Sequence, residues 1–357
     1  MTNGTTSGGG DARVGLVGFG LAGAVFHAPL VAATKGLRLA AVVTSNPERS
    51  RRARSLYPGA LVYDDAGRMF ERAGDLDLVV IASPNRTHAP LARAALDAGL
   101  HVVVDKPLAA TAAEARWLVE EARRRRLLLT VFQNRRWDGD FLTLAGLVGR
   151  GALGRVLRFE SRFERWRPRP KPGWRQSDEP ADAGGLLYDL GSHLIDQALL
   201  LFGPAARVYA ELERPYEGVG ADNDSFVALT HASGVRSHLW MSSAAAQPGP
   251  RFRALGSEAA YTKFGLDAQE DALREGARPG DPGWGEEPAE RWGLFGAGDD
   301  LRPLRTEPGS YQSFYAGVAA AMRDGAPPPV EPSEAAAALE VIEAARRSHA
   351  EGRAVNL

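Results

Sequence analysis

Apolar residues follow two patterns along the chain, and the first of them occupies the N-terminal third. Short, nearly uninterrupted apolar runs alternate there with longer segments of helical spacing. Strands covered by helices on both faces have such continuous runs, so the pattern predicts a doubly wound α/β domain on a parallel sheet. The predicted strands span residues 13–18, 37–45, 76–84, 101–107 and 127–134, and helices are expected from Pro29 to Ala33, from Pro47, over 87–99 and over 111–126.

The second pattern lies beyond residue 150, where apolar runs, some of them alternating with polar residues, are separated by turn residues. Half-buried strands of an antiparallel sheet have this pattern. The stretch 276–309 is rich in proline and glycine, contains Trp284 and Trp292, and predicts a long loop. The expected strands are 155–163, 206–214, 224–232, 235–243 and 251–257, and two final helices begin at Tyr311 and Ser333.

Length and composition exclude several classes of protein. A chain of 357 residues suits two domains, and 43 basic against 44 acidic residues give no reason to propose nucleic acid or a membrane surface as partner. No apolar run approaches the roughly 18 residues of a membrane helix. The absence of cysteine excludes disulfides and thiol nucleophiles and fits a cytoplasmic protein. Residues 1–12 have no basic start and no apolar stretch, which predicts a flexible tail rather than a signal peptide.

The motif GFGLAG follows the first predicted strand and opens a helix. Its glycines, Gly18, Gly20 and Gly23, match the G-x-G-x-x-G spacing. In this position such glycines allow a tight turn and let a pyrophosphate approach the N-terminus of the helix. The motif therefore predicts a dinucleotide site.

The end of the second strand indicates which dinucleotide binds. NAD-binding domains usually place a carboxylate there for the ribose 2′-hydroxyl. This chain has Thr44 and Ser45 instead, and Arg49 follows in the next helix. A guanidinium and hydroxyls would bind a 2′-phosphate, so NADP is favoured over NAD, although the arginines are also compatible with a plain helix surface.

The segment YDLGSHLIDQ, residues 188–197, places charge inside an otherwise apolar helical run. Asp189 and His193 are four residues apart, and Asp196 shares their face of a helix. Taken alone, this pattern favours a core histidine with a structural carboxylate over a catalytic pair, and the rest of the chain has to decide between them.

Together with GFGLAG, the motifs ASPNRTH at 82–88, HVVVDKPLA at 101–109 and GGLLYDLGSHLIDQ at 184–197 resemble the glucose–fructose oxidoreductase, inositol dehydrogenase and rhizopine-catabolism family, Gfo/Idh/MocA. More narrowly, the chain resembles the NADP-dependent scyllo-inositol dehydrogenases of that family in four segments, VFHAPL at 25–30, NRRWDGDFLTL at 134–144, YDLGSHLIDQ at 188–197 and GLDAQEDALREG at 265–276. The resemblance implies a Rossmann domain over residues 13–133. It also implies an α+β domain over 134–357 with an open, mostly antiparallel sheet, which binds substrate and forms a homodimer or homotetramer.

At matching positions the family pattern assigns Lys106, Asp189 and His193 to catalysis. A histidine suits removal of the hydroxyl proton, a lysine stabilises the alkoxide, and Asp189 would bind a neighbouring hydroxyl and bias His193 towards its working state. The residues expected around the cofactor are Gly18, Phe19, Gly20, Leu21, Ala22, Thr44, Ser45, Arg49, Ser83, Pro84, Asn85, His88, Asp105, Lys106 and Pro107, and those expected around the substrate are Asn134, Arg136, Trp137, Trp174, Asp189 and His193.

The chain departs from the family pattern at Asp105, where the family usually has glutamate, so the contacts of that carboxylate stay open. His27 and His88, each taken alone, are expected at the surface. His231 and His238 flank a predicted hairpin turn, and because no carboxylate cluster accompanies them we expect no metal. A basic, aromatic loop could cover the pocket or be simply solvated, and it contains Arg165, Arg167, Arg169, Trp174 and Arg175.

The sequence therefore predicts an NADP-dependent dehydrogenase of a cyclic polyol or sugar, with scyllo-inositol as the leading substrate. Two alternatives stay open at this point. A glycosidase that oxidises its substrate transiently with bound NAD would give no net NADPH. A cofactor-binding sensor would need none of Lys106, Asp189 and His193.

Overall fold

The first sheet carries the six parallel strands expected of a dinucleotide-binding fold. The computed structural model describes residues 10–169, 173–216 and 218–357, so most of the predicted N-terminal tail lies outside the described residues. Within these ranges the strand order is β3-β2-β1-β4-β5-β6, and the order reverses its direction beside β1. The strands are β1 (Ala12–Val17), β2 (Leu37–Val43), β3 (Leu61–Tyr63), β4 (Leu78–Ile81), β5 (His101–Asp105) and β6 (Leu129–Phe132).

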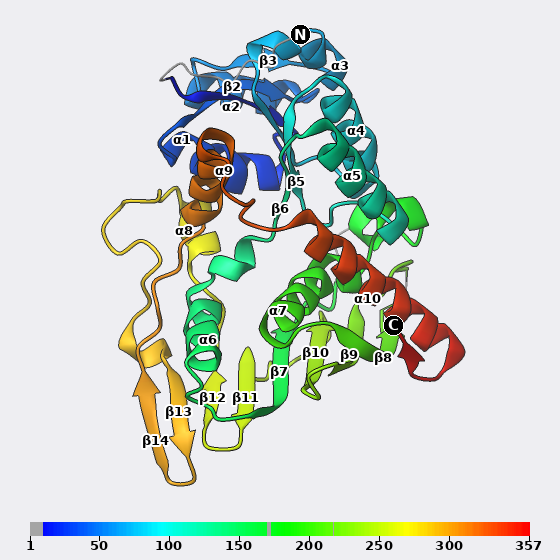
Figure 1. The fold of residues 1–357 in the computed structure, drawn as a ribbon, viewed down its shortest axis with the longest axis vertical. Coiled ribbons are helices and arrows are strands. Elements are labelled where there is room, and N and C mark those ends of the chain that lie inside the picture. The colour runs from blue at the N-terminus through cyan, green and yellow to red at the C-terminus, as the bar shows by residue number, and fades with distance from the viewer. Residues whose placement is uncertain (1–9, 170–172, 217) are drawn as a thin grey trace.

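Helices alternate with these strands and lie around the sheet (Figure 1). A capping box begins α5, because Thr111 and Glu114 exchange side-chain-to-backbone hydrogen bonds there. The predicted alternation is confirmed, but the short edge strand β3 and helix α3 were missed, since three residues show no periodicity. The helices are α1 (Ala28–Ala33), α2 (Pro47–Leu56), α3 (Ala66–Phe70), α4 (His88–Asp97) and α5 (Ala112–Arg125).

The second sheet is mixed and mostly antiparallel. Its described strands have the order β14-β13-β12-β11-β7-β10-β9-β8-β15, and only β7 and β10 pair in parallel. The five predicted strands are all present. They are β7 (Val156–Glu164), β8 (Ala205–Glu213), β9 (Asp224–His231), β10 (Arg236–Ser242) and β11 (Phe252–Gly256), and the sheet also contains β12 (Ala260–Lys263), β13 (Gly293–Ala297), β14 (Asp300–Leu304) and β15 (Val355–Asn356).

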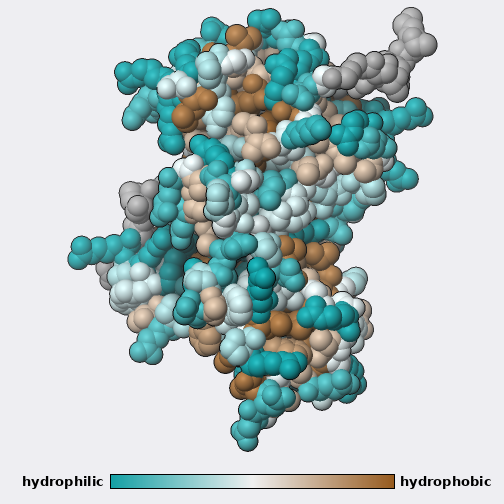
Figure 2. Space-filling model, turned by 90° about the vertical axis from the view of Figure 1, so that its left-hand side faces the viewer, coloured by the Kyte–Doolittle hydropathy of each residue, from teal (hydrophilic) through white to brown (hydrophobic). Residues whose placement is uncertain are grey.

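The stretch 276–309 is not entirely a loop, and this prediction is corrected. It contains the hairpin β13–β14, which projects from one end of the second sheet (Figure 1). Glycine and proline within these strands hid the pattern, because both residues are uncommon in strand interiors. The hairpin exposes Leu294 and Leu301. On the side shown in Figure 2, hydrophobic residues form separate patches within a largely hydrophilic surface.

Helices of the C-terminal half connect the two sheets. Helix α10 packs on β8 of the second sheet and on α5 beside the first, and α9 packs on α1 (Figure 1). The last two helices begin where the sequence predicts. Among the described residues, no helix is long and apolar enough to cross a membrane. The helices of this half are α6 (Gly139–Gly149), α7 (Ser192–Phe202), α8 (Gln269–Glu275), α9 (Gln312–Asp324) and α10 (Pro332–Glu351).

Candidate active site

The glycine-rich turn after β1 packs so closely that side chains are excluded. Gly18 has a φ of 99°, and a Cβ there would stand 2.6 Å from the carbonyl oxygen of Ala82. A Cβ on Gly23 would collide with the carbonyl of Gly18. The chain continues into a π-helical segment, Ala22–His27, before α1. The turn therefore keeps its backbone accessible, as a pyrophosphate site requires, and the fit to a dinucleotide is good.

The other residues predicted in this turn differ in what they expose. Phe19 is buried, with its ring edge-on to Tyr57 at 6.3 Å, so only its backbone can face a ligand. Leu21 is half-exposed. Gly20 lies beneath a basic group, because a Cβ there would stand 3.7 Å from Nη1 of Arg49.

Arg49 reaches this turn from the first turn of α2. Asn46 caps that helix, with its side-chain oxygen accepting from the backbone N–H of Arg49 at 2.9 Å. Thr44 and Ser45 precede the cap and follow β2 directly. The hydroxyls, the helix N-terminus and the guanidinium thus lie at the carboxyl end of β2, which is the place where a ribose phosphate would bind.

The loop after β4 is held to the neighbouring loop and to the second half of the chain. Ser83 and Thr87 share a hydroxyl hydrogen bond of 2.6 Å beside Pro84. Asn85 donates to the carbonyl of Ala183 at 3.2 Å. His88 is buried, contrary to the surface position expected for it alone, with its ring nitrogens 2.7 Å from the Pro107 carbonyl and 2.9 Å from the Ser83 carbonyl. Its side chain therefore joins the loops after β4 and β5.

Asp105, at the end of β5, lies over a buried histidine. His27 is fully buried, and the expected surface position is wrong. Its Nδ1 is 2.6 Å from the hydroxyl of Tyr315, and its Nε2 is 3.8 Å from Asp105 Oδ2. Burial opposes ionisation of Asp105, but His27 and Lys106 outweigh it and lower the pKa of this carboxyl. The shorter side chain at 105 is thus ionised, with Oδ2 facing His27 and Oδ1 accepting from the backbone N–H of Lys106 at 2.8 Å.

Lys106 and Asp189 form an ion pair between the two halves of the molecule. Lys106 Nζ donates to Asp189 Oδ1 at 2.8 Å and also to the Asp189 backbone carbonyl. Burial opposes ionisation of Asp189, but the charges of Lys106, Arg175 and Arg165 prevail and lower its pKa to about 2. The carboxylate of Asp189 is therefore ionised at any physiological pH.

His193 lies on the first turn of α7, after a π-helical segment, Leu187–Gly191. Its exposed fraction is 6%, and burial together with the charges of Lys106, Arg135 and Arg251 lowers its pKa well below 6.5. Among the described residues, its hydrogen-bond partner is Gln133, whose Oε1 is 3.1 Å from Nδ1. No hydrogen bond joins Asp189 to His193 in the described part of the chain, and the bias that the sequence assigns to Asp189 stays a prediction.

Two predicted substrate-binding residues have structural partners instead. The guanidinium of Arg136 binds Asp196 twice, at 2.6 and 2.8 Å, and Glu334 at 2.8 Å. The ring of Trp137 packs at the edge of Phe314, 5.7 Å between centroids. Both side chains thus have partners within the protein, and their expected contact with the substrate stays a prediction. Asn134 is buried beside them.

Part of the basic, aromatic loop reaches the ion pair. Arg175 Nε is 3.8 Å from Asp189 Oδ1, and its guanidinium lies over the ring of Trp174 at 4.4 Å. Residues 170–172 of this loop lie outside the described residues. The loop thus contributes a cation and an aromatic surface beside Lys106 and Asp189.

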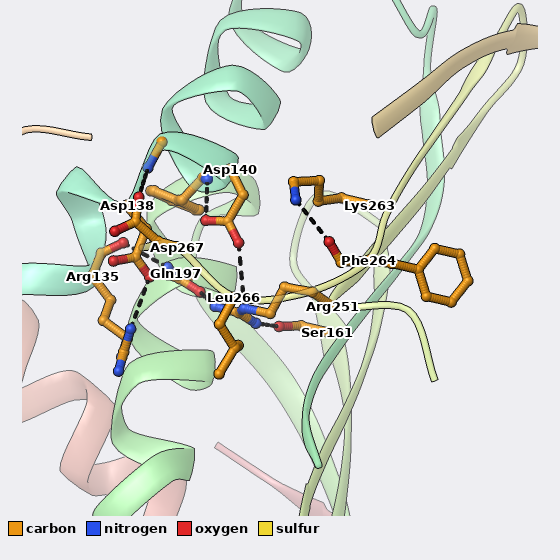
Figure 3. Close-up of polar contacts among 12 residues, drawn as sticks. Arg135, Asp138, Asp140, Ser161, Gln197, Arg251, Lys263, Phe264, Leu266 and Asp267 are labelled. Atoms are coloured by element: carbon orange, nitrogen blue, oxygen red, sulfur yellow. Dashed lines mark hydrogen bonds and ion pairs between the residues drawn. The ribbon is translucent and has the colours of Figure 1, made fainter. Parts of the chain in front are cut away.

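A buried polar network joins the start of α6 to Gln197 in the middle of α7 (Figure 3). Arg251 donates to Ser161 at 2.6 Å and to Gln197 at 2.9 Å, and its Nε is 3.8 Å from Asp140. Gln197 in turn donates to the carbonyl of Arg135 at 2.8 Å. Among the described residues, no group of three or more His, Asp or Glu side chains is arranged to hold a metal ion.

Sequence reasoning missed Gln133 because a single glutamine after a strand has no spacing that marks it. Two of the carboxylates in Figure 3, Asp138 and Asp140, were also missed. Their signal was present, since two acidic residues beside an apolar helix require buried partners.

Comparisons with known proteins agree with this arrangement. Residues 12–133 match the family model described as "Oxidoreductase family, NAD-binding Rossmann fold", and residues 145–357 match "Oxidoreductase family, C-terminal alpha/beta domain". The oxidoreductase YdgJ of Escherichia coli is 40% identical over 93% of this chain and 94% of its own length. The scyllo-inositol 2-dehydrogenase (NADP(+)) IolW of Bacillus subtilis is 35% identical over 97% of this chain and 96% of its own.

A solved structure, that of the oxidoreductase YvaA from Bacillus subtilis, has a TM-score of 0.91 to this chain at 34% identity and covers 98% of this chain and 99% of its own. Both halves of the chain match family models, and two relatives above one-third identity cover nearly all of it. The chain is an oxidoreductase of the Gfo/Idh/MocA family.

Proposed function

We propose that this protein is an NADP(H)-dependent dehydrogenase acting on a ring carbinol or ketone of a cyclic polyol or sugar, with scyllo-inositol as the leading substrate. The observation that carries the proposal is the convergence of the Lys106–Asp189 pair and the neutral imidazole of His193 at the carboxyl edge of the first sheet. The name of the relative IolW supports the choice of substrate and cofactor.

The side chains divide the chemistry of a hydroxyl group between them. His193 accepts the hydroxyl proton on Nε2, since Nδ1 faces Gln133. Lys106 stabilises the negative charge that develops on the same oxygen. Asp189 orients Lys106 and, together with Trp174 and Arg175, offers groups that can bind neighbouring hydroxyls.

The cofactor would be held by residues 13–133 and would accept the hydride when bound. We assign its pyrophosphate to the turn from Gly18 to Ala22, and its 2′-phosphate to Thr44, Ser45 and Arg49. The loop of Ser83, Pro84 and Asn85 borders the nicotinamide end. Residues 134–357 would bind the substrate.

We also infer assembly as a homodimer or homotetramer through the second sheet. Strands β9 and β10 bury alternate residues, and their other residues include Phe226, His238 and Trp240, which contact one another. Arg162 lies over the Trp240 ring at 3.9 Å. Light scattering should give a multiple of the chain mass, and Trp240→Glu should reduce it; a monomeric wild-type protein contradicts this inference.

The proposed activity is tested by following NADPH absorbance with a panel of inositols, aldoses, sugar phosphates and uronic acids. We expect net NADPH formation with at least one cyclic polyol or sugar and NADP. Product without net NADPH would indicate transient oxidation, and no reaction with the whole panel would count against a dehydrogenase of this substrate class.

A further inference from the structure

The side chain of Gln133 contacts the imidazole of His193 in a buried place. Gln133 directly follows β6, is 3% exposed, and has its Oε1 3.1 Å from His193 Nδ1. An amide oxygen carries lone pairs and no hydrogen, so the ring nitrogen that faces it must carry the proton. In a neutral imidazole the other nitrogen, Nε2, then has a free lone pair.

A second glutamine fixes this geometry one turn further along α7. Gln197 donates to the backbone carbonyl of Arg135, two residues after Gln133, at 2.8 Å. Arg251 holds the same amide through its Oε1 at 2.9 Å (Figure 3). Helix α7 and the chain leaving β6 are thus joined at His193 and again at Gln197, which fixes the position of the imidazole relative to Gln133.

The charged groups around His193 make the choice of tautomer important. Lys106, Arg135 and Arg251 all disfavour a second proton on the ring, and the carboxylate of Asp189 is bound to Lys106. The ring is therefore neutral in the resting protein, and a neutral ring can present either an N–H or a lone pair at Nε2. Only the lone pair can accept a proton from a hydroxyl.

We propose that Gln133 is a positioning residue whose amide oxygen holds His193 as the Nδ1-protonated tautomer, so that Nε2 faces the substrate with a free lone pair. When the substrate O–H bond breaks, an Nε2–H bond forms and the electron pair stays on the substrate oxygen. The imidazolium keeps its Nδ1–H donated to Gln133. The catalytic role of Nε2 rests on the proposed dehydrogenase activity. The tautomer of His193 does not, because it can be measured in the protein without substrate.

The direct test is solid-state ¹⁵N spectroscopy of protein labelled at its 7 histidines. The His193 resonances are those lost in His193→Ala. In the wild-type protein near neutral pH we expect a protonated Nδ1 and an unprotonated Nε2. Gln133→Leu puts an apolar side chain of similar volume in place of the amide and removes the acceptor, so both tautomers should appear. We expect kcat to fall about 10- to 100-fold, the loss found when a metal-ligating histidine loses its hydrogen-bond partner.

Gln133→Glu tests the same contact in the opposite direction. A carboxylate beside Nδ1 favours the imidazolium, so the doubly protonated ring should persist to higher pH. The acid limb of kcat/KM for oxidation should move to higher pH with it. If residue 133 does not contact the imidazole, Gln133→Glu should move neither the spectrum nor the pH profile.

Gln312→Leu is the matched control, because this half-buried glutamine accepts from Trp284 Nε1 at 2.8 Å rather than from a histidine. It should leave the His193 resonances unchanged. A wild-type spectrum with protonated Nε2, or an unchanged tautomer in Gln133→Leu, would overturn the proposal even if the variants lose activity. The expected tautomer in a protein that oxidises no polyol or sugar would instead count against the dehydrogenase assignment alone.

Discussion

Lys106 is attached to Asp189 at two points, the carboxylate Oδ1 at 2.8 Å and the backbone carbonyl of the same residue. The two residues are 83 positions apart in sequence and come from opposite halves of the chain. The ammonium group is therefore fixed in direction before any substrate binds, and little reorganisation is needed to stabilise an alkoxide.

This relationship predicts different effects for its two partners. Lys106→Met should lower kcat roughly a hundredfold or more, since it removes the charge stabiliser but keeps the length of the side chain. Asp189→Asn keeps the shape and removes the charge, so it should mainly raise KM. Steady-state kinetics on both variants separates the two roles, and a Lys106→Met enzyme with nearly normal kcat would contradict the assignment.

The pH profile of the rate follows from the surroundings of His193. Burial and three nearby cations lower its pKa well below 6.5, and an unprotonated ring is required to accept the hydroxyl proton. For oxidation, kcat/KM should stay level as the pH falls to about 6.5, the ordinary value for histidine, and decline only at lower pH. In Asp189→Asn the charge of Lys106 is uncompensated, so this decline should move to still lower pH. A decline of kcat/KM centred above pH 6.5 in the wild-type enzyme would contradict a lowered pKa of His193.

Cofactor preference should depend on Arg49, whose guanidinium lies over the glycine turn. Calorimetric titration should give tighter binding of NADP than of NAD. Arg49→Glu should weaken NADP by about tenfold or more and shift preference towards NAD, because a carboxylate repels a 2′-phosphate and suits a ribose hydroxyl.

The control for Arg49 is Arg54→Glu, the same charge change later in the same helix, at a residue that donates to Ser50. It should change both affinities little. Equal affinities in the wild-type protein, or an Arg49→Glu protein that still prefers NADP, would refute the proposed phosphate site.

The sequence predicts the two sheets well because periodicity and turn residues are local signals. It misses β3 and the hairpin β13–β14, where strands are short or contain glycine and proline. The site is predicted by motif, but its partners are not. Arg136, which was expected at the substrate, pairs with Asp196, 60 positions away, and with Glu334, 198 positions away. No local pattern in the sequence indicates ion pairs between residues so far apart.

The partners of His27 could not be predicted from local sequence patterns either. A single histidine carries no local sign of its partners and was expected at the surface, and only the fold places Tyr315 and Asp105 against its ring. The contact between Gln133 and His193 likewise joins a strand end to a helix 60 positions later.

The buried network around Arg251, which includes Asp140 and Gln197, should contribute to stability. Arg251 lies between the rings of Phe163 and Phe252 and faces Asp140. Arg251→Met should destabilise the protein by about 3–5 kcal/mol, because Asp140 is left buried without its cation. Adding Asp140→Asn should recover much of that loss, as denaturant unfolding can measure. A double variant no more stable than Arg251→Met alone would show that the aromatic contacts, not the charge, carry the effect.

The role of His193 can be separated from simple core packing. If it is the acid–base group, His193→Ala should lower kcat by roughly two to four orders of magnitude, the range for a positioned proton-transfer group. NADP affinity should hardly change, because the residue belongs to α7 rather than to the first sheet. A histidine that only fills the core predicts the opposite pattern, in which a cavity lowers stability by about 1 kcal/mol or more while specific activity stays normal. Thermal unfolding and turnover are measured on the same preparations. A destabilised but fully active His193→Ala enzyme would falsify the catalytic assignment.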